Sequence, residues 1–275
     1  MRWSRLMWLC LALSLAAPAV PEAFAAPPAA KVKPVKRKKP FMFIMGDSNI
    51  WGHLGREMQP RFVKLGWRVY RRGKPYSGLA RPDFFDWIDK CPFLIRALSP
   101  EVVVIMLGGN DAQVISPLHG AAPDTPMISW EDEARWTAEY ERRVERLVGV
   151  LASGGATVYW LSPTNRKPIY ARAAMRRIVP AQRRAVERTG LAVFVDTFEL
   201  TSLPNGEYIA SGEKHGHTIP YRYLDGIHMT PPGANVLIDQ LLPTIAACRT
   251  PLALSTPDGD PIESDAACEP LAIQP

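Results

Sequence analysis

The segment FMFIMGDSNIWG, residues 41–52, constrains the fold more than any other part of the chain. Five consecutive apolar residues, Phe41 to Met45, predict a strand buried on both faces, as in parallel sheets. Gly46 then turns the chain, because glycine accepts backbone conformations that other residues avoid. Ser48 therefore lies where a strand ends and a helix begins, which is where open α/β sheets place their ligands. Its hydroxyl is either a helix cap or a nucleophile beside helix N–H groups.

Further apolar runs alternate with segments of helical periodicity. The expected strands cover residues 67–70, 102–107, 157–161 and 192–195, and the expected helices cover 49–65, 130–151, 170–188 and 233–247. Pro60 and Pro180 are expected to bend or interrupt their helices, and the arginines of 170–188 are expected to form a solvated face. This alternation predicts right-handed βαβ crossovers. We expect one doubly wound, flavodoxin-like α/β domain over residues 41–250, with five parallel strands in the order 2-1-3-4-5.

The N-terminal residues have the pattern of a secretory signal peptide. Arg2 and Arg5 precede an apolar stretch, and Ala23-Phe24-Ala25 offers a small-x-small cleavage site. We therefore expect residues 1–25 to be a leader and the protein to be exported, either periplasmic or extracellular.

A basic linker, residues 26–40, follows the leader. It carries six Lys and Arg residues and no acid, so the net charge of +6 is concentrated there and the domain itself is close to neutral. Nucleic acid is therefore not an expected partner. The Pro/Lys composition predicts an extended, disordered segment, either a solvated spacer or in contact with an anionic envelope.

Three cysteines remain after the leader: Cys91, Cys248 and Cys268. Export would place them in an oxidising compartment. A bridge between Cys248, just before the C-terminal tail 251–275, and Cys268, within that tail, would close a loop of about 20 residues and contribute about 3 kcal/mol. Cys91 would then be a buried thiol, although spacing alone also permits Cys91 as a bridge partner.

Two residues late in the chain can activate Ser48. A serine hydroxyl is a poor nucleophile unless a base removes its proton and a third group orients that base. Asp225 and His228 lie three residues apart in LDGIH, and Thr230-Pro231 then predicts the start of a helix. Asp225 can hold the imidazole while His228 takes the Ser48 proton. The alternative for an isolated Asp-x-x-His is a surface turn.

An oxyanion needs hydrogen-bond donors. The backbone N–H groups of Ser48 and Gly78 and the side-chain amide of Asn110 are available. Asn110 follows the expected strand 102–107, which the predicted order places beside the first strand, so Asn110 and Ser48 should face one crevice. Individually, Gly78 and Asn110 also suit turns or caps.

Four blocks together resemble the SGNH (GDSL) hydrolase family: Gly46-Asp47-Ser48, Gly78, Gly108-Gly109-Asn110-Asp111 and Asp225-x-x-His228. They occur in the family's order and span residues 46–228. The stretch SGLARPDFFDW and the leader are similar to a bacterial envelope, periplasmic subgroup of the family. The G-x-S-x-G elbow of α/β-hydrolases is absent, in agreement with this resemblance.

The resemblance implies a Ser-His-Asp esterase. Ser48 would be the nucleophile, His228 the base and Asp225 its orienting partner; Ser48, Gly78 and Asn110 would bind the oxyanion, with Asp47 and Asp111 in support. With export, it implies hydrolysis of an O-acetyl ester on an envelope or exported polysaccharide through an acyl-Ser48 intermediate. The alternatives are a glycan O-acyltransferase, a lipid or thioester hydrolase, and a non-catalytic glycan-binding envelope protein.

No cofactor and no metal are expected. The pair His215 and His217 lacks a third ligand, and no phosphate-loop or dinucleotide fingerprint is present. Four aromatic residues near the expected site suit either sugar stacking or core packing: Trp51, Tyr76, Phe84 and Trp87. The acyl length and the oligomeric state are left open by the sequence.

Overall fold

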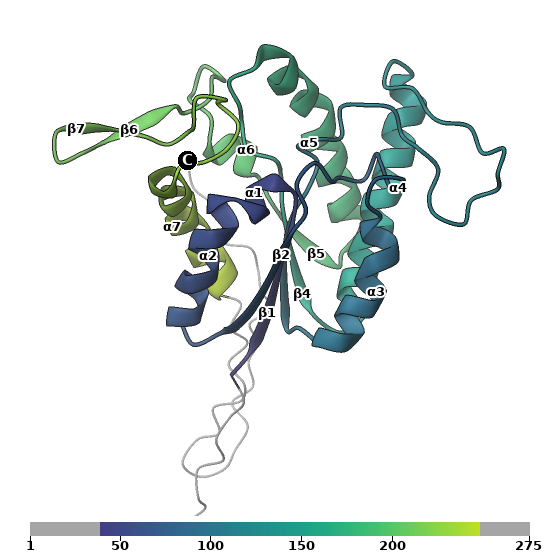
Figure 1. Ribbon diagram of the computed structural model, residues 1–275, viewed down its shortest axis with the longest axis horizontal. Coiled ribbons are helices and arrows are strands. Elements are labelled where there is room, and N and C mark those ends of the chain that lie inside the picture. Colours follow the sequence, from purple (N-terminus) through teal and green to yellow (C-terminus); the bar gives the residue numbers. More distant parts are fainter. Residues whose placement is uncertain (1–38, 248–275) are drawn as a thin grey trace, which may run out of the picture. The chain divides into compact units, whose positions relative to one another are not determined.

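The structure, a computed structural model, describes residues 39–247 (Figure 1). The strands are β1 (Phe41–Gly46), β2 (Arg68–Gly73), β3 (Val102–Met106), β4 (Thr157–Leu161), β5 (Ala192–Val195), β6 (Ser211–Lys214) and β7 (His217–Pro220). The helices are α1 (Ser48–Trp51), α2 (His53–Lys64), α3 (Trp87–Leu98), α4 (Glu133–Ala152), α5 (Ile169–Thr189), α6 (Thr197–Leu200) and α7 (Pro231–Ala247). The predicted leader, nearly all of the linker and the tail lie outside the described residues.

The main sheet is parallel and has the order β2-β1-β3-β4-β5, which confirms the predicted α/β class and strand order. β6 and β7 form a separate antiparallel hairpin in the insertion before α7. The carboxyl ends of β1 and β3 meet because Gly46 pairs with Met106. The turns that carry Ser48 and Asn110 therefore start side by side.

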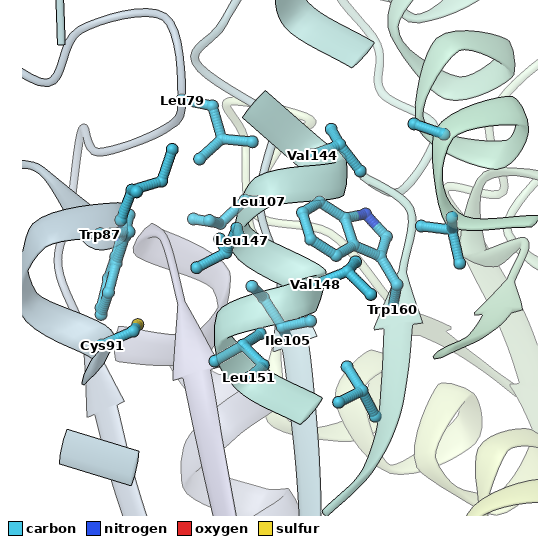
Figure 2. Close-up of a cluster of buried hydrophobic side chains, with 14 of the residues drawn as sticks. Leu79, Trp87, Cys91, Ile105, Leu107, Val144, Leu147, Val148, Leu151 and Trp160 are labelled. Carbon is cyan, nitrogen blue, oxygen red and sulfur yellow. The ribbon is translucent and has the colours of Figure 1, made fainter. Parts of the chain in front are cut away.

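Helices cover both faces of this sheet, with α2 and α7 on one side and α3, α4 and α5 on the other (Figure 1). Alternate β1 side chains enter opposite layers: Phe43 and Met45 pack with the α3–α5 layer, whereas Met42 and Ile44 pack with the α2–α7 layer. This is why β1 is apolar at consecutive positions. Figure 2 shows the α3–α5 layer, in which Trp87 of α3 and Leu147, Val148 and Leu151 of α4 pack with Ile105 of β3 and Trp160 of β4.

Neither of the two prolines predicted to bend or interrupt a helix interrupts it. Pro60 lies inside α2 and Pro180 inside α5, and both helices continue through them. In α2 the apolar face of Leu54, Met58 and Phe62 is buried along its length, so tertiary packing outweighs the lost hydrogen bond. The break falls instead at Gly52, an extended residue between α1 and α2.

Other differences concern elements without a strong periodic signal. The helix α3 begins after Asp86, whose carboxylate caps the N–H of Asp89, and was not predicted as a helix. The helix α6 and the β6–β7 hairpin lie in stretches for which no helix or strand was predicted. β2 extends to Gly73, three residues beyond its predicted end, because it pairs with the whole of β1.

Cys91, a residue of α3, is a buried free thiol, whereas the predicted bridge between Cys248 and Cys268 lies outside the described residues. Burial raises the pKa of the Cys91 thiol to about 12. Within residues 39–247, no helix combines the length and apolar character needed to span a bilayer.

Candidate active site

Ser48 is held at the turn between β1 and α1 by tight backbone packing. A β-carbon on Gly46 would lie 2.1 Å from the carbonyl oxygen of Met106, so only glycine fits there. Asp47, not Ser48, caps α1, because its carboxylate accepts the N–H of Asn49 at 2.9 Å. The alternative in which Ser48 is the helix cap is therefore wrong. Ser48 is the first helical residue, and its hydroxyl remains free to face the loop before α7.

The structure brings Ser48, His228 and Asp225 together. The imidazole Nε2 of His228 lies 2.9 Å from Ser48 Oγ, and its Nδ1 lies 2.7 Å from Asp225 Oδ2. The other carboxylate oxygen, Asp225 Oδ1, accepts the backbone N–H groups of Ile227 at 2.8 Å and His228 at 3.0 Å. These bonds fix the carboxylate, so that the Nδ1–H tautomer of His228 points its lone pair at the serine.

The electrostatics of Asp225 suit an ionised partner for the imidazole. Its partial burial acts to raise its pKa, but the hydrogen bonds from His228 and from the backbone outweigh burial, so the pKa lies below its ordinary value. The carboxylate therefore stays charged through the mildly acidic range.

Arg222 anchors the loop that carries this pair. Its buried guanidinium donates to the hydroxyl of Thr164 and to the carbonyl of Ile227, both at 3.1 Å, and so joins the β4 loop to the His228 loop. Burial lowers the pKa of Arg222 to about 10. As predicted, Thr230 caps α7, accepting the N–H of Gly233 at 3.2 Å. The loop is thus fixed at both ends.

Asn110 and the segment around Gly78 are also brought together. The Asn110 amide donates to the carbonyl of Ser77 at 2.9 Å, which leaves its second N–H for a ligand. Asn110 lines the same cavity as Ser48, whereas Gly78 is buried beside it and is not among the lining residues. The two candidate donors are therefore adjacent.

Asp111 holds the Gly78 segment in place. Its buried carboxylate accepts the N–H groups of Leu79 and Ala80, each at 2.9 Å, and the hydroxyl of Tyr140 at 2.9 Å. Gln182 donates to that hydroxyl at 3.0 Å and completes the network. Burial raises the pKa of Asp111, and it does the same for Asp47. Tyr140 and Gln182 were not predicted, because a polar residue on a helix carries no sign of its distant partner.

Arg166 is a further site residue that the sequence did not reveal. It follows β4, is only 4% exposed, and donates through Nη1 to the carbonyl of Gly109 at 2.9 Å. A β-carbon on Gly109 would lie 2.9 Å from both Arg166 Nη2 and Asp47 Oδ2. A glycine is therefore needed where the turns after β1, β3 and β4 converge.

These residues open onto a cavity of about 570 Å³, hereafter the Ser48 cavity. Four partly exposed aromatic residues line it: Trp51, Tyr76, Tyr170 and Tyr223. Of the other aromatics considered from sequence, Trp87 is a core residue, with its indole N–H donated to Ser77 Oγ at 2.9 Å. Phe84 is outside the cavity, beneath the ammonium of Lys74.

The two histidines in the insertion belong to the β6–β7 hairpin. The described part of the chain contains no group of three His, Cys, Asp or Glu side chains arranged to hold a metal ion.

Comparison with known proteins agrees with this architecture. A family model described as protein of unknown function, DUF459, matches residues 41–244. The chain belongs to the DUF459 family. No curated protein matches its sequence significantly.

Solved structures share the fold of this DUF459 protein. A GDSL-like lipase from Bacteroides thetaiotaomicron is 18% identical, with a TM-score of 0.50 over 80% of this chain and 93% of the lipase. A catalytic mutant of an acetylxylan esterase from Geobacillus stearothermophilus is 17% identical, with a TM-score of 0.46 over 74% of this chain and 92% of the esterase. The DUF459 protein thus has the SGNH/GDSL hydrolase fold, and the predicted resemblance is confirmed.

Proposed function

We propose that the protein is a serine esterase that hydrolyses O-acetyl esters of a cell-envelope or exported polysaccharide. The observation that carries the proposal is the continuous chain of contacts from Ser48 Oγ through the His228 imidazole to the Asp225 carboxylate, at 2.9 and 2.7 Å. These are the distances at which a base can take a proton from a nucleophile. These three hydrogen-bonded side chains open onto a cavity, where they have no evident structural purpose.

In the proposed reaction Ser48 Oγ attacks the ester carbonyl carbon while its proton passes to His228 Nε2. The resulting oxyanion is stabilised by the N–H groups of Ser48 and Gly78 and by the free amide N–H of Asn110. When the intermediate collapses, the carbon–oxygen bond to the alcohol breaks and His228 returns the proton to the departing oxygen. Water then attacks the acyl carbon while its proton passes to His228. The bond between the acyl carbon and Ser48 Oγ breaks, and His228 returns the proton to Oγ, which releases the acid and free Ser48.

The substrate class rests on the cavity and on the predicted leader. Aromatic rings exposed at a cavity suit the apolar faces of sugar rings, and tyrosine adds a polar edge. Tyr76 and Tyr170 are the most exposed of these, at 77% and 79%. If the leader directs export, an acetylated glycan would be the ester that such a rim meets.

The test begins with 4-nitrophenyl acetate. We expect the wild type to hydrolyse it and Ser48→Ala to lose the activity by at least about 1000-fold, because the nucleophile is gone. Ser153→Ala, which changes an exposed serine at the end of α4, is the matched control and should retain full activity. A fluorophosphonate probe should label the wild type and the control but not Ser48→Ala. Equal rates for Ser48→Ala and the wild type would refute the proposal.

Substrate class is then tested by acetate release from isolated O-acetylated glycan, with and without an acceptor sugar. Release into water supports the esterase. Acetyl transfer to the acceptor instead identifies an O-acyltransferase, which the size of the cavity would also permit.

A further inference from the structure

The charges around the Ser48 cavity are not balanced. Among the described residues that line it, Arg56 and Arg166 are cationic, and Asp225 alone is acidic. Asp225 is already occupied by His228 and by two backbone N–H groups. An entering substrate therefore meets two guanidinium groups without a free carboxylate beside them.

Arg166 is the buried member of this pair. Only its Nη1 is used, toward the Gly109 carbonyl, whereas Nε and Nη2 have no hydrogen-bond partner. The buried Arg222 stands close enough that the charge of Arg166 adds to burial in lowering the Arg222 pKa. Asp47 offsets part of the Arg166 charge, and the two unfilled donors are the remaining cost, because a buried N–H group without an acceptor is unfavourable.

Arg56 is the accessible member. Its guanidinium lies 5.2 Å from the centre of the Trp51 ring, a cation–π distance, and no described carboxylate lies within ion-pair range of it. Its positive neighbour is Arg71, which donates to the carbonyls of Ile50 and Trp51 at 2.8 and 3.2 Å. Stacking on Trp51 restricts the guanidinium plane, so less entropy is lost when its free N–H edge binds a planar anion.

The helix α2 adds to the same field. Its first residues line the cavity, its N-cap Gly52 supplies no side-chain acceptor, and its first turn contains no acid. The partial positive charge of a helix N-terminus thus faces the same space as Arg56 and Arg166.

We propose that the Ser48 cavity selects esters carried on acidic sugars, with the sugar carboxylate bound by Arg56 and the ring against the aromatic rim. This inference rests on the proposed esterase function and specifies its substrate class. A carboxylate fits because its two oxygens match the two N–H groups at one edge of a guanidinium. Arg166, beneath, strengthens the attraction without touching the sugar.

The experiment compares two mono-O-acetylated sugars that differ in one charge, a methyl glucuronoside and a methyl glucoside, by acetate release. We expect the wild type to prefer the glucuronoside about tenfold in kcat/KM, as one charge-assisted contact implies. Arg56→Gln should abolish the preference, so that the two sugars are cleaved with about equal kcat/KM. Arg56→Lys should retain part of the preference. The preference should also fall as sodium chloride is raised.

Arg96→Gln is the control. It removes the same charge from an exposed position on α3, away from the cavity, and should keep the wild-type preference. A wild type that cleaves 4-nitrophenyl acetate but does not favour the glucuronoside, or an Arg56→Gln variant with an undiminished preference, would overturn the inference and leave the esterase standing. Failure to cleave any ester would refute the esterase itself.

Discussion

Replacing Gly78 with alanine tests how the proposed oxyanion site is held. A β-carbon at position 78 would lie 1.9 Å from Asp111 Oδ1 and 2.6 Å from its Cγ. Neither side can yield easily, because Asp111 is buried and is bonded to Leu79, Ala80 and Tyr140. The added methyl group therefore acts as a wedge between the Gly78 segment and the carboxylate that anchors it.

The size of the effect follows from this geometry. A carbon atom requires about 3.5 Å from a non-bonded neighbour, so the Gly78 segment must move by roughly 1.5 Å to clear Asp111. A misplacement of about 1 Å at an active site can cost about 100-fold in rate. Complete loss of one oxyanion donor costs about 100- to 1000-fold, or about 2.7–4 kcal/mol. We therefore expect kcat for 4-nitrophenyl acetate to fall by about 100- to 1000-fold in Gly78→Ala, with KM little changed.

The assay is steady-state kinetics, normalised to the folded fraction from thermal unfolding so that lost protein is not counted as lost catalysis. Gly149→Ala is the matched control: it lies in α4, a β-carbon there meets no atom within 4 Å, and its activity should be unchanged. Its free energy of unfolding should rise by up to about 1 kcal/mol, because alanine favours helix over glycine. A Gly78→Ala enzyme with kcat within twofold of the wild type would show that the added methyl group does not disturb the oxyanion site, and would refute this reasoning.

Three further predictions concern single side chains. Asp225→Asn should lower kcat by up to about 10⁴-fold, since the amide would favour the wrong imidazole tautomer; a loss below tenfold in steady-state kinetics would contradict the orienting role. Cys91 should resist iodoacetamide at pH 8 in the native protein and react after denaturation, because burial raises its pKa to about 12; peptide mass spectrometry decides this. Asp83 has a pKa lowered from 3.8 to about 2, chiefly by its hydrogen bond with Arg81. Because the folded-state value is the lower one, its stabilisation is complete above pH 3.8 and is lost as the pH falls through about 2; urea unfolding of Asp83→Asn should therefore be less sensitive to pH than the wild type between pH 4 and 2.

The sheet was predictable because its strands carry their own signal. β1 is apolar at every position before its final Gly46, and β3 is apolar throughout, since both faces are covered; a run of that kind between helical segments admits few other structures. Ser48 and Asn110 could be placed in one crevice because the ends of adjacent parallel strands meet. Asp225 and His228 could be placed with them only through the order of the four motif blocks, because the loop before α7 has no periodicity from which its path could be derived.

What the sequence could not reveal shares one physical cause. Tyr140 contacts Asp111 and Gln182 across separations of tens of residues, and Tyr140 and Gln182 are each an ordinary polar residue when viewed in their own segments. Arg166 is similar: in sequence it is one of many arginines, several of which form surface ion pairs on α5. Its burial beside Asp47, in place of a surface ion pair, distinguishes it from these arginines, and burial is a property of the assembled fold. The role of a polar residue thus depends on the residues that surround it in the folded protein. For Arg166 these are the turns that carry Asp47 and Asn110. Its charge acts on Asp47, next to the proposed nucleophile, and on Arg222, which anchors the His228 loop.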